Sequence, residues 1–315
     1  MGMNEVCYWL KEHDRFAVMG HVSPDGDSYG STLAMCMALR NAGKQAFVLA
    51  DPVPHMYAFL PGQDMICRLE NCPFEPEAVI HLDIASLDRA AYALAKPLPS
   101  LLIDHHQTNA GFDDVMLIDA SASSAGEILM RLFEHAGVAI DRDMAACLFT
   151  SISTDTGSFQ FSNTTAETMR YIGVLIDTGL DISRLSTLIF RRRTLARTRL
   201  TGEVLTNMFV SEDGKITVGS ISLSMMEKYG AVHADTETIV NYLVEVEGVC
   251  MAALLEEGED SVKVSLRSNE GYNAAEVAVS FGGGGHMLAA GATLHDTTLA
   301  SAEEMVKKAL RKAVG

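Results

Sequence analysis

The sequence predicts an α/β protein with two domains: an N-terminal domain built on a doubly wound, mostly parallel sheet, and a smaller α/β domain after it. Three observations support this prediction. Short apolar strands alternate with amphipathic helices in the first half of the chain, which is typical of a parallel sheet covered by helices. After Leu185 the pattern changes. The 315 residues also exceed the roughly 250–300 that a single hydrophobic core usually supports.

The elements of the N-terminal domain follow from local patterns. Apolar runs predict strands over 16–20, 45–50, 78–82 and 100–103. Amphipathic or apolar patterns of helical spacing predict helices near 28–42, 87–95 and 144–152. Two capping-box patterns, one from Ser124 to Glu127 and one from Thr164 to Glu167, predict helices that run to about Ala136 and Asp177.

The second half predicts a linker followed by a smaller domain. The basic stretch 190–199 looks helical, and we interpret 186–202 as a helical linker. The run Arg191–Arg193 has two possible roles, a solvated helix face, which is the simpler one, and a cationic arm near phosphates. The sequence does not decide between them. The later elements are strands over 204–210, 215–222, 249–256, 261–268 and 290–295, and helices near 235–246, 273–280 and 299–313. We therefore expect domains at 1–185 and 203–315, with the active site in the cleft between them.

The charge balance restricts the partners. The chain has 24 basic and 41 acidic residues, a formal net charge of −17. Proteins that track a long phosphate backbone usually present a basic face, so a nucleotide or short oligonucleotide fits better than duplex DNA. No apolar run reaches the roughly 18–20 residues that cross a bilayer, and the N-terminus does not resemble a signal peptide. We expect a cytoplasmic protein without membrane contact and with six reduced cysteines. A homodimer is left open.

Acidic and imidazole side chains gather where the predicted strands end. Asp104, His105 and His106 directly follow the apolar run 101–103. Acidic or imidazole side chains likewise follow two other predicted strands and the helix at 144–152. Open α/β sheets place their ligand crevice at the carboxyl ends of the strands. The candidate ligands at this edge are His21, Asp25, Asp27, Asp83, Asp104, His105, His106 and Asp155.

This set of side chains predicts a metal centre. So many carboxylates at one edge would be costly without cations to neutralise them. Asp and His ligands without a thiolate point to Mn²⁺ or a similar ion. Gly26 permits a tight turn between Asp25 and Asp27, so that these two acids can reach different ions. Two divalent ions about 3.5–4 Å apart can share a carboxylate and activate a water, which is hydrolytic phosphoryl chemistry. Alone, an acid such as Asp83 would be read as a cap or turn residue.

The motifs resemble those of a known family. The segments HVSPDGDSYGS, Asp83, DHH and STDTG, followed by GGGGH near the C-terminus, are similar in type and order to the DHH/DHHA1 phosphoesterase superfamily. Within it, the size and two-domain layout resemble the stand-alone bacterial oligoribonuclease/pAp phosphatases, the nanoRNase type. The resemblance covers nearly the whole chain. One departure is Ser86, which stands where many members carry another acid.

The resemblance implies a role for each matching residue. One ion would be bound by His21, Asp25 and Asp83. The second would be bound by Asp27, Asp83, His105 and Asp155, with Asp83 as the bridge. His106 would face the scissile phosphate, and Asp104 would orient the cluster from behind the ligands.

The C-terminal domain supplies candidate substrate contacts. Four consecutive glycines at 282–285 can approach a ligand closely and present N–H groups as an anion nest. We therefore assign substrate binding to Gly283, Gly284, Gly285 and His286. Arg267 is a second candidate, through a charge-assisted contact with a phosphate. The resemblance supports both, because this domain binds the nucleotide end of the substrate in the family. Asn109 is a further candidate for a hydrogen bond to substrate.

These features predict a Mn²⁺-dependent phosphodiesterase that acts on very short oligonucleotides and also on adenosine 3′,5′-bisphosphate. A cyclic dinucleotide phosphodiesterase, acting on cyclic di-AMP, is the alternative, and the sequence holds no feature that decides between them. A nucleotide sensor without catalysis is disfavoured by the intact ligand set. The glycine-rich motif argues against a pyrophosphatase, and the modest size and acidity argue against an exonuclease that acts on long single strands.

Overall fold

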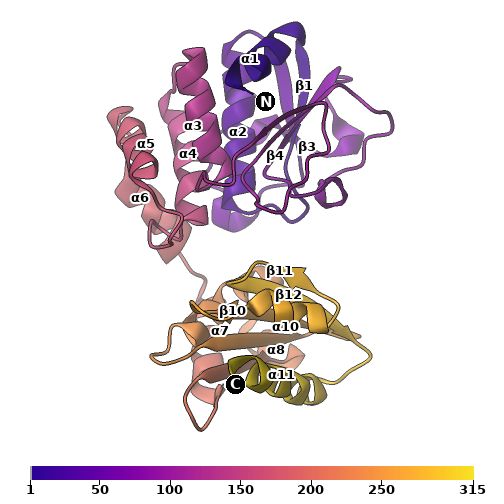
Figure 1. Cartoon of the computed structure of the whole chain (residues 1–315), viewed down its shortest axis with the longest axis vertical. Coiled ribbons are helices and arrows are strands. Elements are labelled where there is room, and N and C mark those ends of the chain that lie inside the picture. The colour runs from indigo at the N-terminus through magenta and orange to yellow at the C-terminus, as the bar shows by residue number, and fades with distance from the viewer. Residues whose placement is uncertain (1) are drawn as a thin grey trace. The chain divides into compact units, whose positions relative to one another are not determined.

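The computed structural model describes residues 2–315, which form two compact units. The first unit ends at Arg192, and the second comprises Arg193–Gly315. The division falls within 186–202, the segment interpreted above as the linker. Each unit has its own six-stranded sheet and its own hydrophobic core (Figure 1).

The first unit is built on a parallel sheet with the strand order β3-β2-β1-β4-β5-β6. Its strands are β1 (Arg15–Met19), β2 (Gln45–Leu49), β3 (Ile66–Cys67), β4 (Ala78–Leu82), β5 (Ser100–Asp104) and β6 (Val115–Ile118). The order reverses between β1 and β4, and ligands bind outside the carboxyl ends of strands at such a point. The predicted doubly wound parallel sheet is therefore confirmed.

Helices cover one face of this sheet. They are α1 (Met3–Glu12), α2 (Gly26–Asn41), α3 (Ala125–Ala136), α4 (Arg142–Asp155), α5 (Ala166–Asp177) and α6 (Ile182–Ser186). Because alternate residues of a strand face opposite sides, Phe16 and Val18 of β1 point into the core that the helices share with the sheet. Figure 1 shows α2, α3 and α4 side by side.

The opposite face of the sheet is covered by irregular chain. Met19 packs there with side chains from the segment 67–98. The predicted helix over 87–95 is wrong, since only a short 3₁₀ turn forms at Leu87–Arg89. The N–H of Ala91 donates to the carbonyl of Gly20 at 3.0 Å, so the segment pairs with the chain that leaves β1 and not with itself. This pairing holds the chain around His21 in place.

The two predicted capping patterns have different outcomes. Helix α3 begins as predicted, with the Ser124 hydroxyl accepting the N–H of Glu127. Helix α5 is capped by Thr165, one residue later than predicted, and Thr168 completes its capping box. The hydroxyl of Thr168 also donates to the buried carboxylate of Glu127, and this contact favours Thr168 over Glu167 as the partner in the box.

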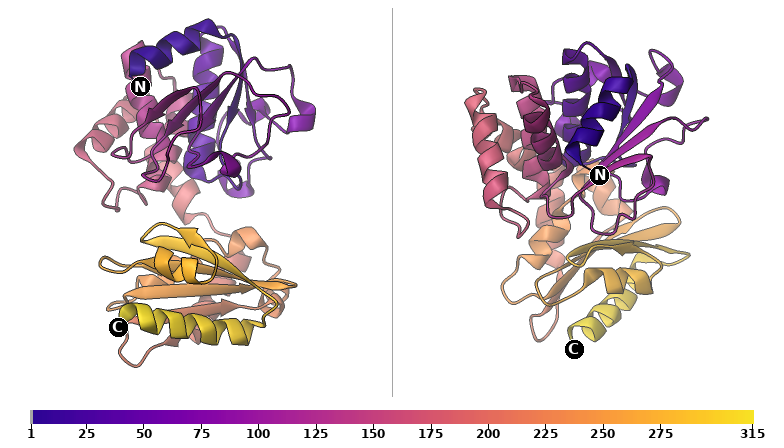
Figure 2. Two further views of the ribbon diagram at one scale, coloured as in Figure 1. Left: turned by 45° about the vertical axis from the view of Figure 1, so that its right-hand side comes forward. Right: turned by 45° about the horizontal axis from the view of Figure 1, so that its top comes forward.

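The second unit contains a mixed sheet with the order β11-β12-β10-β9-β8-β7, in which only β8 and β9 run parallel. Its strands are β7 (Phe209–Val210), β8 (Ile216–Ile221), β9 (Met251–Glu257), β10 (Ser261–Ser268), β11 (Gly284–Gly285) and β12 (Ala289–His295). Its helices are α7 (Leu195–Asn207), α8 (Leu223–Tyr229), α9 (Ile239–Val244), α10 (Ala274–Ser280) and α11 (Leu299–Val314). Helix α11 lies along one face of the sheet (Figure 2).

Two predictions for this part of the chain are wrong. The strand predicted over 204–210 is mostly the end of α7, because Leu200 and Val204 are buried one helical turn apart. The helix predicted over 190–199 is broken before Leu195, where the Thr194 hydroxyl caps α7. Helix α8 was not predicted. Among the residues described, none of the helices combines the length and the apolar character that a membrane crossing requires.

Candidate metal centre

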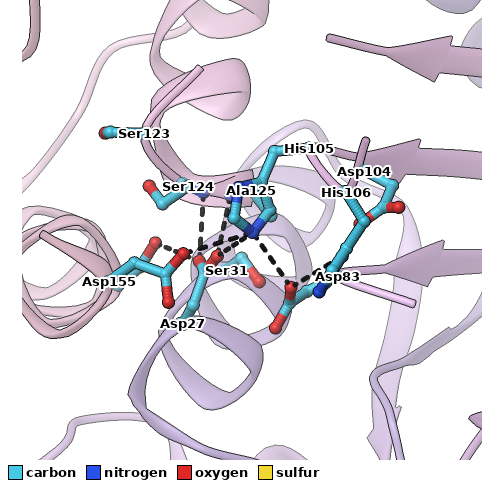
Figure 3. A network of polar contacts seen from close by, with 12 residues as sticks. Asp27, Ser31, Asp83, Asp104, His105, His106, Ser123, Ser124, Ala125 and Asp155 are labelled. Carbon is cyan, nitrogen blue, oxygen red and sulfur yellow. Dashed lines mark hydrogen bonds and ion pairs between the residues drawn. The ribbon is translucent and has the colours of Figure 1, made fainter. Parts of the chain in front are cut away.

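Acidic and imidazole side chains from five elements of the first unit meet at one edge of its sheet. Figure 3 shows Asp27, Asp83, His105 and Asp155 of this set. His21 follows β1, Asp83 follows β4, and His105 follows β5. The other members lie at the start of α2 and at the end of α4. They are Asp25, Asp27 and Asp155. The structure thus brings together all seven residues that the sequence analysis proposed as metal ligands or as the phosphate-facing histidine, including His106.

Asp83 lies between two imidazoles. Its Oδ2 is 3.5 Å from Nε2 of His21, and its Oδ1 is 3.5 Å from Nε2 of His105. The residue is buried, and its backbone has φ of 58°. This left-handed conformation is uncommon for a residue with a side chain, and such residues concentrate at functional sites. Each oxygen of this carboxylate therefore faces a different histidine.

The first group of metal-type donors contains His21, Asp25 and Asp83. Nδ1 of His21 lies 2.8 Å from the carbonyl of Val22, which orients the ring so that Nε2 faces the two carboxylates. Oδ1 of Asp25 accepts the N–H groups of Asp27 and Ser28, and Asp25 is thereby the N-cap of α2. Capping holds Asp25 next to the cluster although its side chain is exposed.

The second group contains Asp27, His105 and Asp155. Nε2 of His105 lies 3.2 Å from Oδ2 of Asp155 and 3.6 Å from Oδ2 of Asp27. Asp27 is completely buried, and the N–H groups of Ala125 and Gly126 donate to it at 2.8 and 3.2 Å. These N–H groups belong to the first turn of α3, whose partial positive charge favours an anion.

The support of Asp27 was missed by the sequence analysis. Besides the backbone of α3, the hydroxyl of Ser151 on α4 donates to Oδ1 of Asp27. The sequence held one indication that Ser151 lies near the cluster. Ser151 precedes Asp155 by four residues and therefore shares its helix face. The capping pattern at Ser124 marked the start of α3, but the sequence did not show which anion would lie there.

Close packing between helices makes these contacts possible. A Cβ added to Gly30 of α2 would lie 2.4 Å from the carbonyl oxygen of Cys147 on α4. One added to Gly126 of α3 would lie 1.9 Å from Oγ of Ser151. The absence of side chains at these two positions lets α2, α3 and α4 approach closely enough for Asp27 to reach both neighbouring helices.

Asp104 and His106 form a supporting pair. Nδ1 of His106 lies 2.8 Å from Oδ1 of Asp104 and 3.8 Å from Oδ1 of Asp83. Asn109 donates to Oδ2 of Asp104 and to the carbonyl of Ile84. Both N–H bonds of the Asn109 amide are used in these contacts. Asn109 therefore positions Asp104, and its hydrogen bond to substrate stays a prediction.

The charges of the cluster are strongly coupled. Burial opposes protonation of the two imidazoles, but the facing carboxylates outweigh it and raise the pKa of His21 to about 11 and that of His105 to about 10. Burial also opposes ionisation of Asp83, but its contacts with His105 and His21 outweigh that effect and lower the pKa of Asp83. Burial and the charge of Asp83 raise the pKa of Asp27 to about 7.

This electrostatic pattern suits divalent cations. Burial and the charge of Asp27 raise the pKa of Asp155 well above its ordinary value. The acids thus carry more negative charge than two imidazoles neutralise, and protons take up the excess. The donors are carboxylate oxygens and imidazole nitrogens without a thiolate, a set that fits Mn²⁺ or a similar ion.

Apart from Asn109, the predicted substrate residues lie in the second unit. Arg267 on β10 is half-buried, and its Nε donates to Oδ1 of Asn241 at 3.1 Å. Burial lowers the pKa of its guanidinium. Within residues 2–315, no carboxylate forms an ion pair with Arg267. A half-buried cation of this kind is suited to bind an anion.

The glycine run has a different backbone role from the one predicted. The N–H groups of Gly282 and Gly283 donate to carbonyls at the end of α10, and that of His286 donates to Ala289. These N–H groups are not available for an anion nest. A Cβ on Gly283 would lie 2.1 Å from the carbonyl oxygen of Gly291, so Gly283 is required for pairing with β12. Gly284, Gly285 and His286 are exposed.

Comparison with known proteins agrees with this arrangement. Residues 15–152 match the model of the DHH family, N-terminal domain, and residues 213–314 match that of the DHHA1 domain. The structure is similar to the crystal structure of an exopolyphosphatase-related protein from Bacteroides fragilis, with a TM-score of 0.90 and 27% identity, covering 99% of this chain and 94% of that one.

The fold, the Asp/His cluster and these matches define a hydrolase of phosphate esters: the chain belongs to the DHH/DHHA1 phosphoesterase family. Its relatives include two proteins named bifunctional oligoribonuclease and PAP phosphatase NrnA. The one from Thermus thermophilus is 34% identical over 93% of this chain and 88% of the relative. The one from Bacillus subtilis is 30% identical over 96% and 98%.

Proposed function

We propose that this protein is a Mn²⁺-dependent phosphodiesterase that hydrolyses very short oligonucleotides to mononucleotides and also removes the 3′-phosphate of adenosine 3′,5′-bisphosphate. The observation that carries the proposal is the position of Asp83 between His21 and His105. A carboxylate with one oxygen toward each of two donor groups suits a bridge between two ions. The names of the two NrnA relatives support the choice of substrates.

Two groups of side chains would hold the ions. His21, Asp25 and Asp83 would bind the first, and Asp27, Asp83, His105 and Asp155 the second. Two bound ions would supply an activated water and neutralise charge that develops on the phosphate oxygens. The backbone of α3 and Ser151 hold Asp27 in one orientation, as residues behind a metal ligand commonly do.

His106 would contact the phosphate, and Asp104 would support it. Burial opposes a charge on His106, but the contact with Asp104 outweighs it and raises the pKa of His106. The raised pKa favours the protonated ring, in which one N–H faces Asp104 and the other can donate to a phosphate oxygen. Asp104 and Asn109 would fix the orientation of its ring.

The second unit would bind the nucleotide end of the substrate. Arg267, without a carboxylate partner among residues 2–315, would contact a terminal phosphate, and the exposed side chain of His286 would add a donor. The exposed backbone of Gly284 and Gly285, next to Gly283, would allow close approach. These groups bind substrate, whereas those of the first unit carry the chemistry.

Turnover of four substrates tests this function. We expect purified protein with Mn²⁺ to hydrolyse pApA and pGpG fastest, adenosine 3′,5′-bisphosphate more slowly, and cyclic di-AMP least. A higher kcat/KM for cyclic di-AMP than for pApA would favour the cyclic dinucleotide phosphodiesterase instead. Binding of these nucleotides without hydrolysis, with Mn²⁺ present, would favour a sensor.

A further inference from the structure

We propose that Phe161 is a stacking platform for a nucleobase of the substrate. The inference rests on the proposed function, because it requires a nucleotide substrate. Phe161 lies in the turn between α4 and α5, six residues after Asp155, and its side chain is 57% exposed. Three features of this turn support the proposal: its backbone is constrained, the ring has a defined position, and the turn is tied to Asp155.

The backbone of the turn adopts an unusual conformation. Gly157, Ser158 and Phe159 have φ of 54°, 60° and 67° in succession. Left-handed backbone is unfavourable for Ser and Phe and persists only where surrounding contacts impose it. Here the N–H of Ser158 donates to the carbonyl of Ser153 at 2.7 Å, and the Phe159 ring packs near the ring of the buried Phe149.

The Phe161 ring has a defined position on this turn. The carbonyl of Thr156 accepts the N–H groups of both Gln160 and Phe161, at 2.9 and 3.0 Å. A Cβ added to Gly157 would lie 2.4 Å from Cζ of Phe161, so the ring rests against the bare backbone of this glycine. The ring is thus supported by the protein and still more than half exposed.

The turn is also tied to the metal centre. The side-chain amide of Asn163 donates to the carbonyls of Asp155 and Ser123, each at 3.1 Å. Gly157 follows Asp155 by two residues, so their Cα atoms are at most about 7 Å apart. The ring that rests on Gly157 therefore lies within reach of a nucleotide whose phosphate occupies the Asp/His cluster.

Folding of the turn does not require an exposed ring at position 161. The neighbouring Phe159 already supplies the aromatic anchor to the core. An exposed, supported ring beside a phosphate-ester site is suited to stack on a base, since every base has an aromatic face. Stacking would explain how a protein with a net charge of −17 holds short nucleotide chains of different sequence.

Kinetics of substituted proteins test the proposal. Stacking on an aromatic residue corresponds to roughly a five- to hundredfold effect on binding. We expect Phe161→Leu, which keeps apolar bulk but removes the aromatic ring, to raise KM for pApA by about that factor, with kcat changed much less. Phe161→Trp should keep KM at or below the wild-type value. Met169→Ala, at a 51% exposed position on α5, is the matched control and should leave KM unchanged.

A direct readout of stacking is available because Trp9 is the single tryptophan and is buried. In Phe161→Trp, AMP should quench the added fluorescence, whereas ribose 5-phosphate at the same concentration should not. A KM for Phe161→Leu equal to that of the wild type, or equal responses to both ligands, would overturn the stacking role. Failure of the wild-type protein to hydrolyse pApA with Mn²⁺ would instead overturn the proposed function, so the two failures are distinguishable.

Discussion

The hydroxyl of Ser151 donates a hydrogen bond to the buried carboxylate of Asp27, although 124 positions separate the two residues. The contact joins the first turn of α2 to the last turns of α4, the two helices that carry Asp27 and Asp155. Together with the first turn of α3, it holds the Asp27 carboxylate in one orientation.

Ser151→Ala should weaken metal binding without removing any ligand. Loss of a hydrogen bond behind a metal ligand typically costs 10–100-fold in affinity or activity, as an order-of-magnitude estimate. We expect the Mn²⁺ concentration for half-maximal activity to rise by about that factor, and high Mn²⁺ to restore most of kcat. Ser153→Ala is the matched control, because its buried hydroxyl bonds only within its own helix. Equal Mn²⁺ dependence of the two variants would show that the Ser151 contact is unimportant.

Asp83→Asn should remove activity at any Mn²⁺ concentration. Asn has the shape of Asp and tolerates the left-handed backbone at this position, so the fold should survive. The substitution removes the charge that both His21 and His105 face. Isothermal titration calorimetry should show weaker binding at both sites. Asp25→Asn, at an exposed ligand of the first group only, should be partly rescued by excess Mn²⁺. Near-wild-type turnover of Asp83→Asn would exclude a bridging role.

Metal binding should release protons and strengthen as pH rises. The pKa values of about 11 for His21 and about 10 for His105 mean that both are protonated in the metal-free protein at pH 7. Asp27, with a pKa of about 7, is then partly protonated. Divalent ions need these groups deprotonated, so about two or more protons should leave on binding. Calorimetry in buffers of different ionisation enthalpy measures this number. An apparent affinity that stays constant from pH 6 to pH 8 would contradict the assigned protonation states.

The same shifts affect the stability of the metal-free protein. The pKa values of His21 and His105 in the folded state lie above the ordinary value of 6.5. Their contribution to stability is therefore complete below about pH 6.5 and is lost as pH rises toward 10–11. Thermal unfolding in EDTA should show a Tm that falls between neutral pH and pH 10. His21→Gln should reduce this fall.

Arg267→Ala should impair substrate binding and leave metal binding intact. Removing a charged donor to a bound phosphate costs about 1.5–3 kcal/mol, so KM for dinucleotides should rise at least tenfold. A contact of equal strength in the ground and transition states leaves kcat nearly unchanged. Lys263→Ala on the same strand, at an exposed position, is the matched control. A loss of Mn²⁺ affinity in Arg267→Ala would place Arg267 with the metal centre.

Substrate length should be limited. With a net charge of −17, the protein has little to hold a long phosphate backbone, so binding must depend on a few nucleotides. For RNA from dimer to about 20-mer at constant salt, kcat/KM should fall steeply beyond a few nucleotides. A rate that increases with length would indicate a processive exonuclease.

Local sequence patterns were sufficient for most strands and for the acidic and imidazole side chains at their ends. The buried strands β1, β4 and β5 are mostly apolar. The polar residues that follow each apolar run therefore mark where the strand ends. The predicted helix over 87–95 failed because tertiary contacts compete, since this segment pairs with the chain after β1. The nest predicted over 282–285 failed for a local reason, because the N–H groups of Gly282 and Gly283 donate to carbonyls at the end of α10.

The amino-acid sequence by itself determined the type of donors, their order along the chain and the edge of the sheet where they lie, because each follows from residue chemistry and strand polarity. Only the tertiary structure decided which of them meet. The contacts of Asp27 with Ser151, of His105 with Asp155, and of Asp83 with both imidazoles join elements far apart in sequence. They depend on the strand order and on the close approach of helices at glycines such as Gly30, which no local pattern encodes.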